Sequence, residues 1–290
     1  MRRKEFIKKV IMGGSLSIFG LSAFTRINSS HPRENQENEK IGYNHLPNKE
    51  NKTMNKILHK ATTRGDANHG WLHSKHTFSF ANYHNPERMN FGVLRVLNDD
   101  IVSGNMGFST HPHKDMEIIS IPLEGDLKHK DNMGNETVIK CGDIQVMSAG
   151  TGIMHSEYNN NPDQAVKFLQ IWVFPNKKNV TPRYDQITLD VADRKNKMQQ
   201  IVSPNVGDAG VWIHQDAWFN MTNLEKAKEL TYHLNDSKRN GVYVFVLKGD
   251  VTVNNQSLNS RDGLGVWDTN HLNIKADSDT ELLLMEVPMS

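Results

Sequence analysis

Short apolar runs separated by glycine-containing turns make up most of the chain after residue 56. Residues 76–80 (HTFSF) alternate between polar and apolar side chains, and residues 91–97 (FGVLRVL) and 168–174 (FLQIWVF) are rich in strand-forming residues. Glycines at turn positions, such as Gly125 and Gly142, interrupt the pattern before a helical period is established. The pattern therefore predicts an all-β fold.

Two short segments depart from this strand pattern. Residues 98–100 (NDD) are three polar residues in succession and predict a turn. Residues 224–230 (LEKAKEL) suit a short helix, although its apolar stripe is thin. Both segments are expected to connect strands.

A later part of the chain repeats the turn pattern of an earlier part. Residues 247–251 (LKGDV) parallel residues 123–127 (LEGDL), and residues 262–267 (DGLGVW) parallel residues 141–146 (CGDIQV). Each copy places a glycine turn between two strand-forming runs. The repeat predicts two β-barrels of common origin, each closed by hairpins.

Two motifs in the first barrel each place two metal ligands two residues apart. The first is His111 with His113, and the second is His155 with Glu157. Side chains at positions i and i+2 of an extended strand point to the same face. A barrel that brings the two pairs together holds one divalent cation with three imidazoles and one carboxylate, and it leaves positions open for water or substrate.

The second barrel has lost these ligands, so we expect a single metal site. His233 has no second histidine two residues away, and His271 has no carboxylate two residues after it. A lone histidine is more often structural than bound to a metal.

Other residues near the two motifs are weaker candidates. Glu117 follows the first motif on the next predicted strand, where a role in solvent contact or in supporting a ligand is expected. His129 follows the turn at Gly125 and lies near the predicted barrel mouth. Three histidines flank Trp71 and are expected to serve packing or loop hydrogen bonds: His69, His73 and His76.

Composition adds little to this picture beyond the histidines. The chain has 290 residues with 34 basic and 33 acidic side chains, a balance that does not predict binding to nucleic acid or to a membrane surface. The single cysteine, Cys141, excludes an intramolecular disulfide and a cysteine-based zinc site. Its position before Gly142 predicts a buried, inert thiol.

The N-terminus differs in composition from the rest of the chain. Residues 1–9 are basic and precede a weakly apolar run, residues 10–24 (VIMGGSLSIFGLSAF), as in a secretory signal. The order resembles a twin-arginine export signal in which Lys4 replaces the second arginine. The run is short and rich in Gly and Ser, so it does not predict a stable membrane span. We expect export to the periplasm, or a cytoplasmic or N-terminally anchored protein where the signal is not cleaved.

The chain therefore divides into four predicted parts. Residues 1–25 are the export signal, and residues 26–55, which are polar with almost no apolar side chains, are a disordered linker. Residues 56–180 form the N-terminal barrel with the metal site. Residues 181–290 form the C-terminal barrel, which has lost its ligands.

Several longer stretches carry a family resemblance. The spacing of Gly107, His111, His113 and Gly125, followed by Gly142 and His155, resembles the two-motif signature of the cupin superfamily. Six longer stretches resemble the bacterial pirin-like proteins: ANHGWLHSKHTFSFANYHNP, THPHKDMEI, MSAGTGIMHSEYN, QIWVFP, TPRYDQ and WDTNHLNIKADSDTELLLMEVP. The resemblance covers about residues 56–288 and implies a bicupin, with two double-stranded β-helix barrels and the metal in the first.

The resemblance also implies a site and an activity. It places the four ligands on His111, His113, His155 and Glu157, and it implies quercetin 2,3-dioxygenase activity, in which a metal and dioxygen open the central ring of a flavonol. Three imidazoles and a carboxylate suit Fe(II), the expected metal, and also Ni, Mn, Co, Cu or Zn. Glu157 is the expected catalytic base for the substrate hydroxyl.

Other members of the resembling group imply a different function. They are redox-responsive metal proteins that act through protein partners and have no established catalysis. The group implies a monomer. A third alternative is a bicupin whose metal only stabilises the fold, so that removing the metal lowers the melting temperature and changes nothing else.

Overall fold

The computed structural model describes residues 54–290, which all belong to one unit of the chain. The predicted export signal and all but the last two residues of the predicted linker lie outside the described residues. Residue Asn55, which the linker was expected to include, is the first residue of a strand. In the described part of the chain, no helix is long and apolar enough to cross a membrane.

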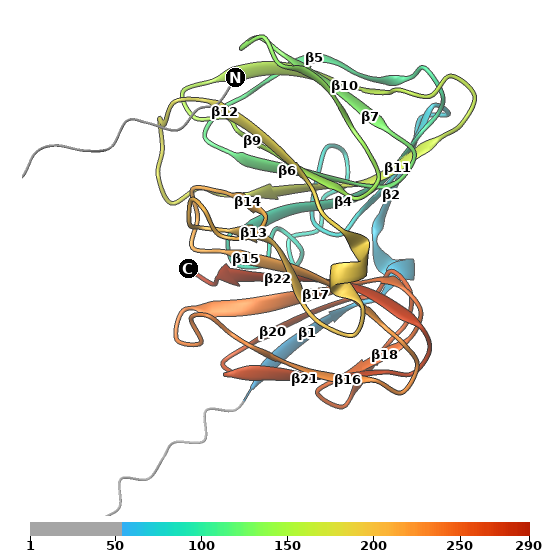
Figure 1. The fold of residues 1–290 in the computed structure, drawn as a ribbon, viewed down its shortest axis with the longest axis vertical. Helices are drawn as coiled ribbons and strands as arrows, with labels where there is room; N and C mark the ends of the chain where they lie inside the picture. The colour runs from blue at the N-terminus through green and yellow to red at the C-terminus, as the bar shows by residue number, and fades with distance from the viewer. Residues whose placement is uncertain (1–53) are drawn as a thin grey trace, which may run out of the picture. The chain divides into compact units, whose positions relative to one another are not determined.

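A first barrel is built from two antiparallel sheets. One sheet has seven strands in the order β12-β9-β6-β11-β4-β3-β2, and the other has four in the order β5-β10-β7-β8 (Figure 1). The strands are β2 (Gly65–Asn68), β3 (Leu72–His76), β4 (Leu94–Val102), β5 (Gly107–His113), β6 (Glu117–Glu124), β7 (Leu127–Asp131), β8 (Glu136–Ile139), β9 (Asp143–Ser148), β10 (Ile153–Asn159), β11 (Val166–Val173) and β12 (Arg183–Thr188).

A second barrel repeats this plan of seven strands and four. Its sheets run β1-β20-β17-β22-β15-β13-β14 and β16-β21-β18-β19. The strands are β1 (Asn55–His59), β13 (Gln199–Ser203), β14 (Val211–Trp212), β15 (Trp218–Leu224), β16 (Glu229–His233), β17 (Asn240–Lys248), β18 (Val251–Val253), β19 (Gln256–Leu258), β20 (Gly263–Trp267), β21 (His271–Ala276) and β22 (Thr280–Pro288). The predicted all-β fold of two barrels is confirmed. Two short 3-10 helices, η1 (Ala61–Thr63) and η2 (Val191–Arg194), are the only helical segments among residues 54–290.

The largest hydrophobic core lies between the two seven-stranded sheets. Ile119 and Ile171 of the first barrel share one buried cluster with Phe219, Phe245 and Leu283 of the second. Because side chains alternate along each strand, the opposite faces of these sheets line the two barrel interiors. The interior of the second barrel is filled by a separate apolar cluster that includes several valines and leucines of β17, β20 and β22.

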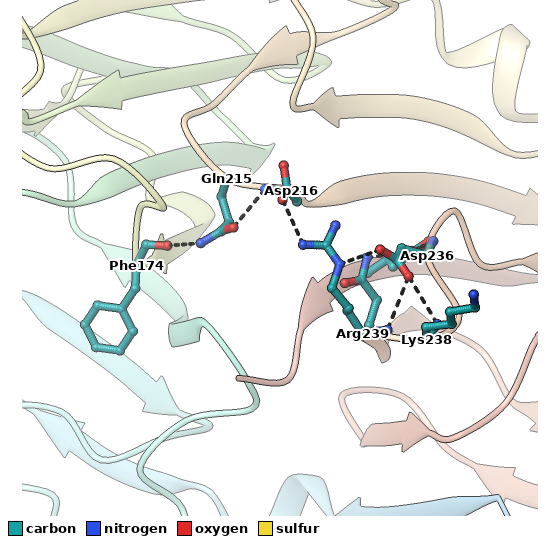
Figure 2. A network of polar contacts seen from close by, with 8 residues as sticks. Phe174, Gln215, Asp216, Asp236, Lys238 and Arg239 are labelled. Carbon is teal, nitrogen blue, oxygen red and sulfur yellow. Dashed lines mark hydrogen bonds and ion pairs between the residues drawn. The ribbon is translucent and has the colours of Figure 1, made fainter. Parts of the chain in front are cut away.

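Polar contacts also join the end of β11 to the second barrel (Figure 2). Gln215 donates from Nε2 to the carbonyl of Phe174 at 2.7 Å and accepts from the backbone N–H of Asp216 at 2.8 Å. Arg239 bridges the carboxylates of Asp216 at 3.4 Å and Asp236 at 2.6 Å. This chain of contacts supports the packing of the two barrels with directional bonds.

The barrels exchange strands, which departs from the predicted division at residues 56 and 180. β1, at the start of the folded chain, pairs with β20 of the second barrel. β12, which follows residue 180, pairs with β9 of the first barrel. Strand pairing depends on register between segments distant in sequence, which the local pattern of residues does not encode.

Three local predictions are wrong. Residues 98–100 lie inside β4, where the side chain of Asp99 contacts Arg261 at 3.0 Å and that of Asp100 accepts from Ser74. Residues 224–230 form the end of β15, a turn and the start of β16, with no helix. Cys141 is exposed, and its Sγ donates to the carbonyl of Leu123 at 3.2 Å.

Candidate metal centre

Strand register places the predicted ligands in two adjacent rows inside the first barrel. His155 on β10 lies opposite His111 on β5 and opposite Asp131 on β7. Two residues further along β10, Glu157 lies opposite His129 on β7. A bulge between His155 and Glu157 shifts the pairing with β5. Burial still alternates along β10, so His155 and Glu157 lie on the same inward face, as the i, i+2 spacing predicts.

A glycine permits the close approach of β5 and β10 beside this bulge. A Cβ atom on Gly107 would collide with the backbone carbonyl oxygen of Glu157. Only a residue without a side chain fits here, so the strand that carries His111 and His113 can lie tightly against β10.

Three imidazoles meet at the inner end of a cavity. The ring centroids of His111, His113 and His155 lie 4.5 to 4.9 Å apart, and one nitrogen of each ring lies within 4.8 Å of the others. Nε2 of His113 and both ring nitrogens of His155 are buried without a hydrogen-bond partner. Nδ1 of His111 contacts the carbonyl of Ser109 at 2.7 Å, which leaves its Nε2 free. Unpartnered ring nitrogens that converge in this way fit a bound metal ion.

Burial keeps two of these imidazoles neutral, as metal ligation requires. Desolvation, and then repulsion from the neighbouring histidines, lowers the pKa of His155 to about 2. Desolvation and His111 lower the pKa of His113 to about 4. A neutral imidazole offers a nitrogen lone pair to a cation, whereas a protonated one repels it.

Glu157 is a fully buried carboxylate held by two donors. Ser120 donates from Oγ at 3.2 Å, and Gln170 donates from Nε2 to the two carboxylate oxygens at 3.2 and 3.0 Å. Burial raises the pKa of Glu157 to about 7. Its carboxylate lies within 4.8 Å of ring nitrogens of His129 and His155, in a second group of donors. The four predicted residues are thus connected through His155, which belongs to both groups.

His129 is more central than the sequence suggested. Its side chain is completely buried, and its Nε2 lies 3.2 Å from the carboxylate of Asp131. Its ring packs against Tyr184 with centroids 4.8 Å apart, and against His155 at 5.3 Å. Burial lowers the pKa of His129. The sequence could have predicted this pairing, because the i, i+2 spacing of His129 and Asp131 places both side chains on one face of a strand.

Glu117 belongs to neither donor group. On β6 it shares a face with Ile119, which lies in the core between the barrels, whereas Ser120 faces Glu157. Its carboxylate accepts from Ser148 Oγ at 2.7 Å, and burial raises its pKa to about 7. The expectation that Glu117 meets solvent or supports a ligand is wrong, because the alternation of β6 turns it toward the second barrel.

The three histidines near Trp71 have separate environments. His73 forms an exposed contact with Asp66 at 2.7 Å. His76 is buried with its ring edge against Phe80, at a centroid distance of 5.2 Å. His69 and His76 line the cavity. His76 packs against an aromatic ring as predicted, whereas His73 lies on β3 and pairs with Asp66 of β2 rather than with a loop; His69 and His76 also border the site.

The cavity has a volume of about 810 Å³ and opens onto His111, His113 and Glu157. Five aromatic side chains contribute to its walls: Trp71, Phe80, Tyr83, Phe108 and Trp172. Most of the lining surface is apolar, and polar residues such as Ser74, Asn98, Asp100 and Gln170 also line the cavity. A pocket with apolar walls and a few placed polar groups is typical of a small-molecule site.

Gln170 and Trp172 were missed by the sequence reasoning. Nε1 of Trp172 donates to Oε1 of Gln170 at 3.1 Å, which turns the Gln170 amide nitrogen toward Glu157. The ring of Trp172 also packs edge-on against His113 at a centroid distance of 4.9 Å. One polar residue inside the apolar run of residues 168–174 was the available signal.

Comparison with known proteins places this site in a family. Residues 28–173 match the family model Pirin, and residues 200–287 match the model described as quercetinase C-terminal cupin domain. A quercetin 2,3-dioxygenase of Escherichia coli K12 is 45% identical over 231 residues, which cover 80% of this chain and 98% of the relative. The chain belongs to the pirin family. A pirin-like protein of Caulobacter vibrioides is 42% identical over 223 residues, which are 77% of this pirin and 95% of the relative.

Solved structures show the same fold. The crystal structure of YhhW from Escherichia coli superposes on this pirin with a TM-score of 0.77 at 44% identity, covering 81% of this chain and 98% of that one. A second structure, of bacterial pirin YhhW in complex with nickel(II), gives a TM-score of 0.76 at 42% identity and covers 81% and 100% of the two chains. The bicupin architecture is thus shared with a relative that holds a metal ion.

Proposed function

We propose that this pirin is a metal-dependent dioxygenase that opens the central ring of flavonols such as quercetin. The observation that carries the proposal is the inner end of the cavity, where unpartnered neutral imidazoles and a buried carboxylate converge below aromatic walls. The name of the Escherichia coli relative supports the choice of substrate and of reaction.

The metal would be held by His111, His113, His155 and Glu157. A divalent ion in such a site lowers the pKa of a coordinated hydroxyl and provides a place for dioxygen to react. Fe(II) suits this donor set and is the proposed ion; Ni(II), which the relative YhhW binds, and Mn, Co, Cu or Zn suit it also.

The protein's own groups would orient the substrate and accept its proton. The aromatic walls, Phe80 and Trp172 among them, match flat aromatic rings by shape and by ring stacking. The carboxylate of Glu157 would accept the proton of a flavonol hydroxyl when its bond to the ion loosens. Gln170 and Ser120 hold that carboxylate in place while the proton is transferred.

The test is oxygen consumption by purified, Fe(II)-loaded protein with quercetin, followed at an oxygen electrode. We expect Glu157→Gln to reduce the rate by about a hundredfold or more, because the proton acceptor and one ligand are both lost. Glu117→Gln is the matched control, since Glu117 is also buried with a pKa of about 7 but faces away from the cavity. The control should retain the wild-type rate.

Two outcomes would contradict the proposal. One is that the metal-loaded protein consumes no oxygen with quercetin or with related flavonols. The other is that Glu157→Gln and wild type consume oxygen at the same rate, which would separate the activity from this site.

A further inference from the structure

The second donor group differs in composition from the first. His129, His155 and Glu157 provide two imidazoles and one carboxylate, with donor atoms within 4.8 Å of one another and all three residues buried. The first group, His111, His113 and His155, provides three imidazoles and is partly exposed to the cavity. Two histidines and one carboxylate with open positions are the donor set typical of non-haem Fe(II) oxygenases.

The contacts of His129 leave one ring nitrogen available to a ligand. Its Nε2 faces the carboxylate of Asp131 at 3.2 Å, so a proton on Nε2 is held there and Nδ1 keeps its lone pair. Nδ1 is buried and has no hydrogen-bond partner. A histidine that donates one N–H to a carboxylate and turns its other nitrogen to an ion is a recurrent arrangement at metal sites.

Asp131 is itself fixed, which gives the His129 ring a defined orientation. Its carboxylate accepts from the backbone N–H groups of Met133 at 2.9 Å and Asn135 at 3.1 Å, and from Nδ2 of Asn135 at 2.8 Å. On the other side, the ring of His129 packs against Tyr184. A ligand held from two sides binds an ion without a further loss of side-chain freedom.

A purely structural histidine in the same protein shows the difference. His59 is also buried with one unpartnered nitrogen, Nε2, while its Nδ1 contacts the hydroxyl of Tyr243 at 2.8 Å. His59 belongs to neither donor group that converges in the described residues. An unpartnered nitrogen alone is therefore no evidence for a ligand. His129 differs from His59 because one of its ring nitrogens also lies within 4.8 Å of two further donors.

We propose that His129, His155 and Glu157 form an inner metal position for Fe(II), deeper in the barrel than the three-imidazole position. Because His155 and Glu157 also belong to the four-ligand site of the proposed function, the inner position and that site are alternatives for one ion and do not hold two ions together. The inference rests on metal binding in the proposed function, and it assigns His129 as a ligand of the inner position.

Metal titration of variants isolates the inner position. The double variant His111→Ala/His113→Ala removes two of the three outer imidazoles and leaves the inner group intact. We expect it to bind one Co(II) per chain, used here as a visible probe for Fe(II), with a measurable absorption spectrum and a rise in melting temperature. Adding His129→Gln should abolish this binding or weaken it by about a hundredfold.

Controls separate ligand loss from damage to the fold. His59→Gln in the same double variant removes a buried histidine that belongs to neither donor group and should leave the Co(II) affinity unchanged. If His129→Gln does not fold, Asp131→Asn removes the carboxylate that orients His129, and it should weaken Co(II) binding by about tenfold.

The inference is overturned if the double variant binds no Co(II), or if its binding is unchanged by both His129→Gln and Asp131→Asn. These readouts are equilibrium binding and absorption spectra, so they do not depend on turnover. Failure of the oxygen assay with a normal Co(II) titration would reject the dioxygenase proposal and leave the inner position standing.

Discussion

The interiors of the two barrels differ although their sheets follow the same plan. In the second barrel, inward residues of β17 and β21 such as Val244, Leu272 and Ile274 form an apolar cluster. In the first barrel, the corresponding space around β10 contains His155, Glu157 and a cavity. Apolar side chains fill the one interior and stabilise it, whereas the polar interior of the other remains open to a ligand.

The contrast is sharpest between two buried glutamates. Glu157 has two side-chain donors and borders the cavity. Glu286 is completely buried and accepts five hydrogen bonds of 2.7 to 3.0 Å. The donors to Glu286 are the side chains of Tyr232, Asn235 and Asn240 and the backbone N–H groups of Asn235 and Asp236. A buried carboxylate whose oxygens all accept hydrogen bonds from the protein has a structural role. A carboxylate that faces a cavity and has oxygen lone pairs without a donor can bind an ion or accept a proton.

The largest expected effect is on stability in the second barrel. Glu286→Ala leaves several buried donors without a partner, so we expect it to lower the free energy of unfolding by about 4 kcal/mol. Glu157→Ala should cost about 1 kcal/mol in metal-free protein, because Gln170 lines the cavity, where water can replace the lost acceptor. Urea unfolding of both variants measures the difference. Equal losses would show that the two carboxylates play the same structural role.

A smaller effect concerns Glu117, which lies on the side of the first barrel that faces the second. Burial raises its pKa in the folded protein to about 7 from 4.5, so folding favours its protonated form. That contribution to stability is complete below pH 4.5 and is lost as pH rises through 7. Glu117→Gln resembles the protonated acid at every pH.

The variant should therefore match wild type at pH 4 and exceed its unfolding free energy by about 3 kcal/mol at pH 8. Urea unfolding of metal-free wild type and variant across this range measures the difference. A difference that does not change with pH would show that Glu117 does not titrate in this window. Metal does not affect the comparison, since Glu117 belongs to neither donor group.

The difference between the barrels was predictable from the sequence only where it is local. Spacing along one strand is enough to place His111 with His113, and His155 with Glu157, on inward faces, and the structure does bring these residues into the same barrel. The approach of His129 to Glu157 depends on the register of β7 against β10, which joins residues 28 positions apart.

Other failures have the same non-local cause. Glu117 is close to His113 in sequence, but His113 lies on β5 of the four-stranded sheet and Glu117 on β6 of the seven-stranded sheet, where it faces the second barrel. Residues 98–100 looked like a turn because they are polar. Partners distant in sequence, Ser74 of β3 and Arg261 of the turn before β20 among them, allow such residues inside a strand. Sequence alone does not show which distant side chain will satisfy a buried polar group.

The smallest expected effect tests how the first barrel holds its carboxylate. Trp172→Phe keeps an aromatic ring in the cavity wall beside His113 but removes the N–H that fixes Gln170. The Gln170 amide is then free to rotate and present its oxygen to Glu157, so we expect the metal affinity to fall by about tenfold. Competition with a chromogenic chelator measures the affinity. An unchanged metal affinity in Trp172→Phe would mean that the indole N–H does not orient the Gln170 amide. The position of Gln170 on its strand would then be enough to direct its hydrogen bond to Glu157.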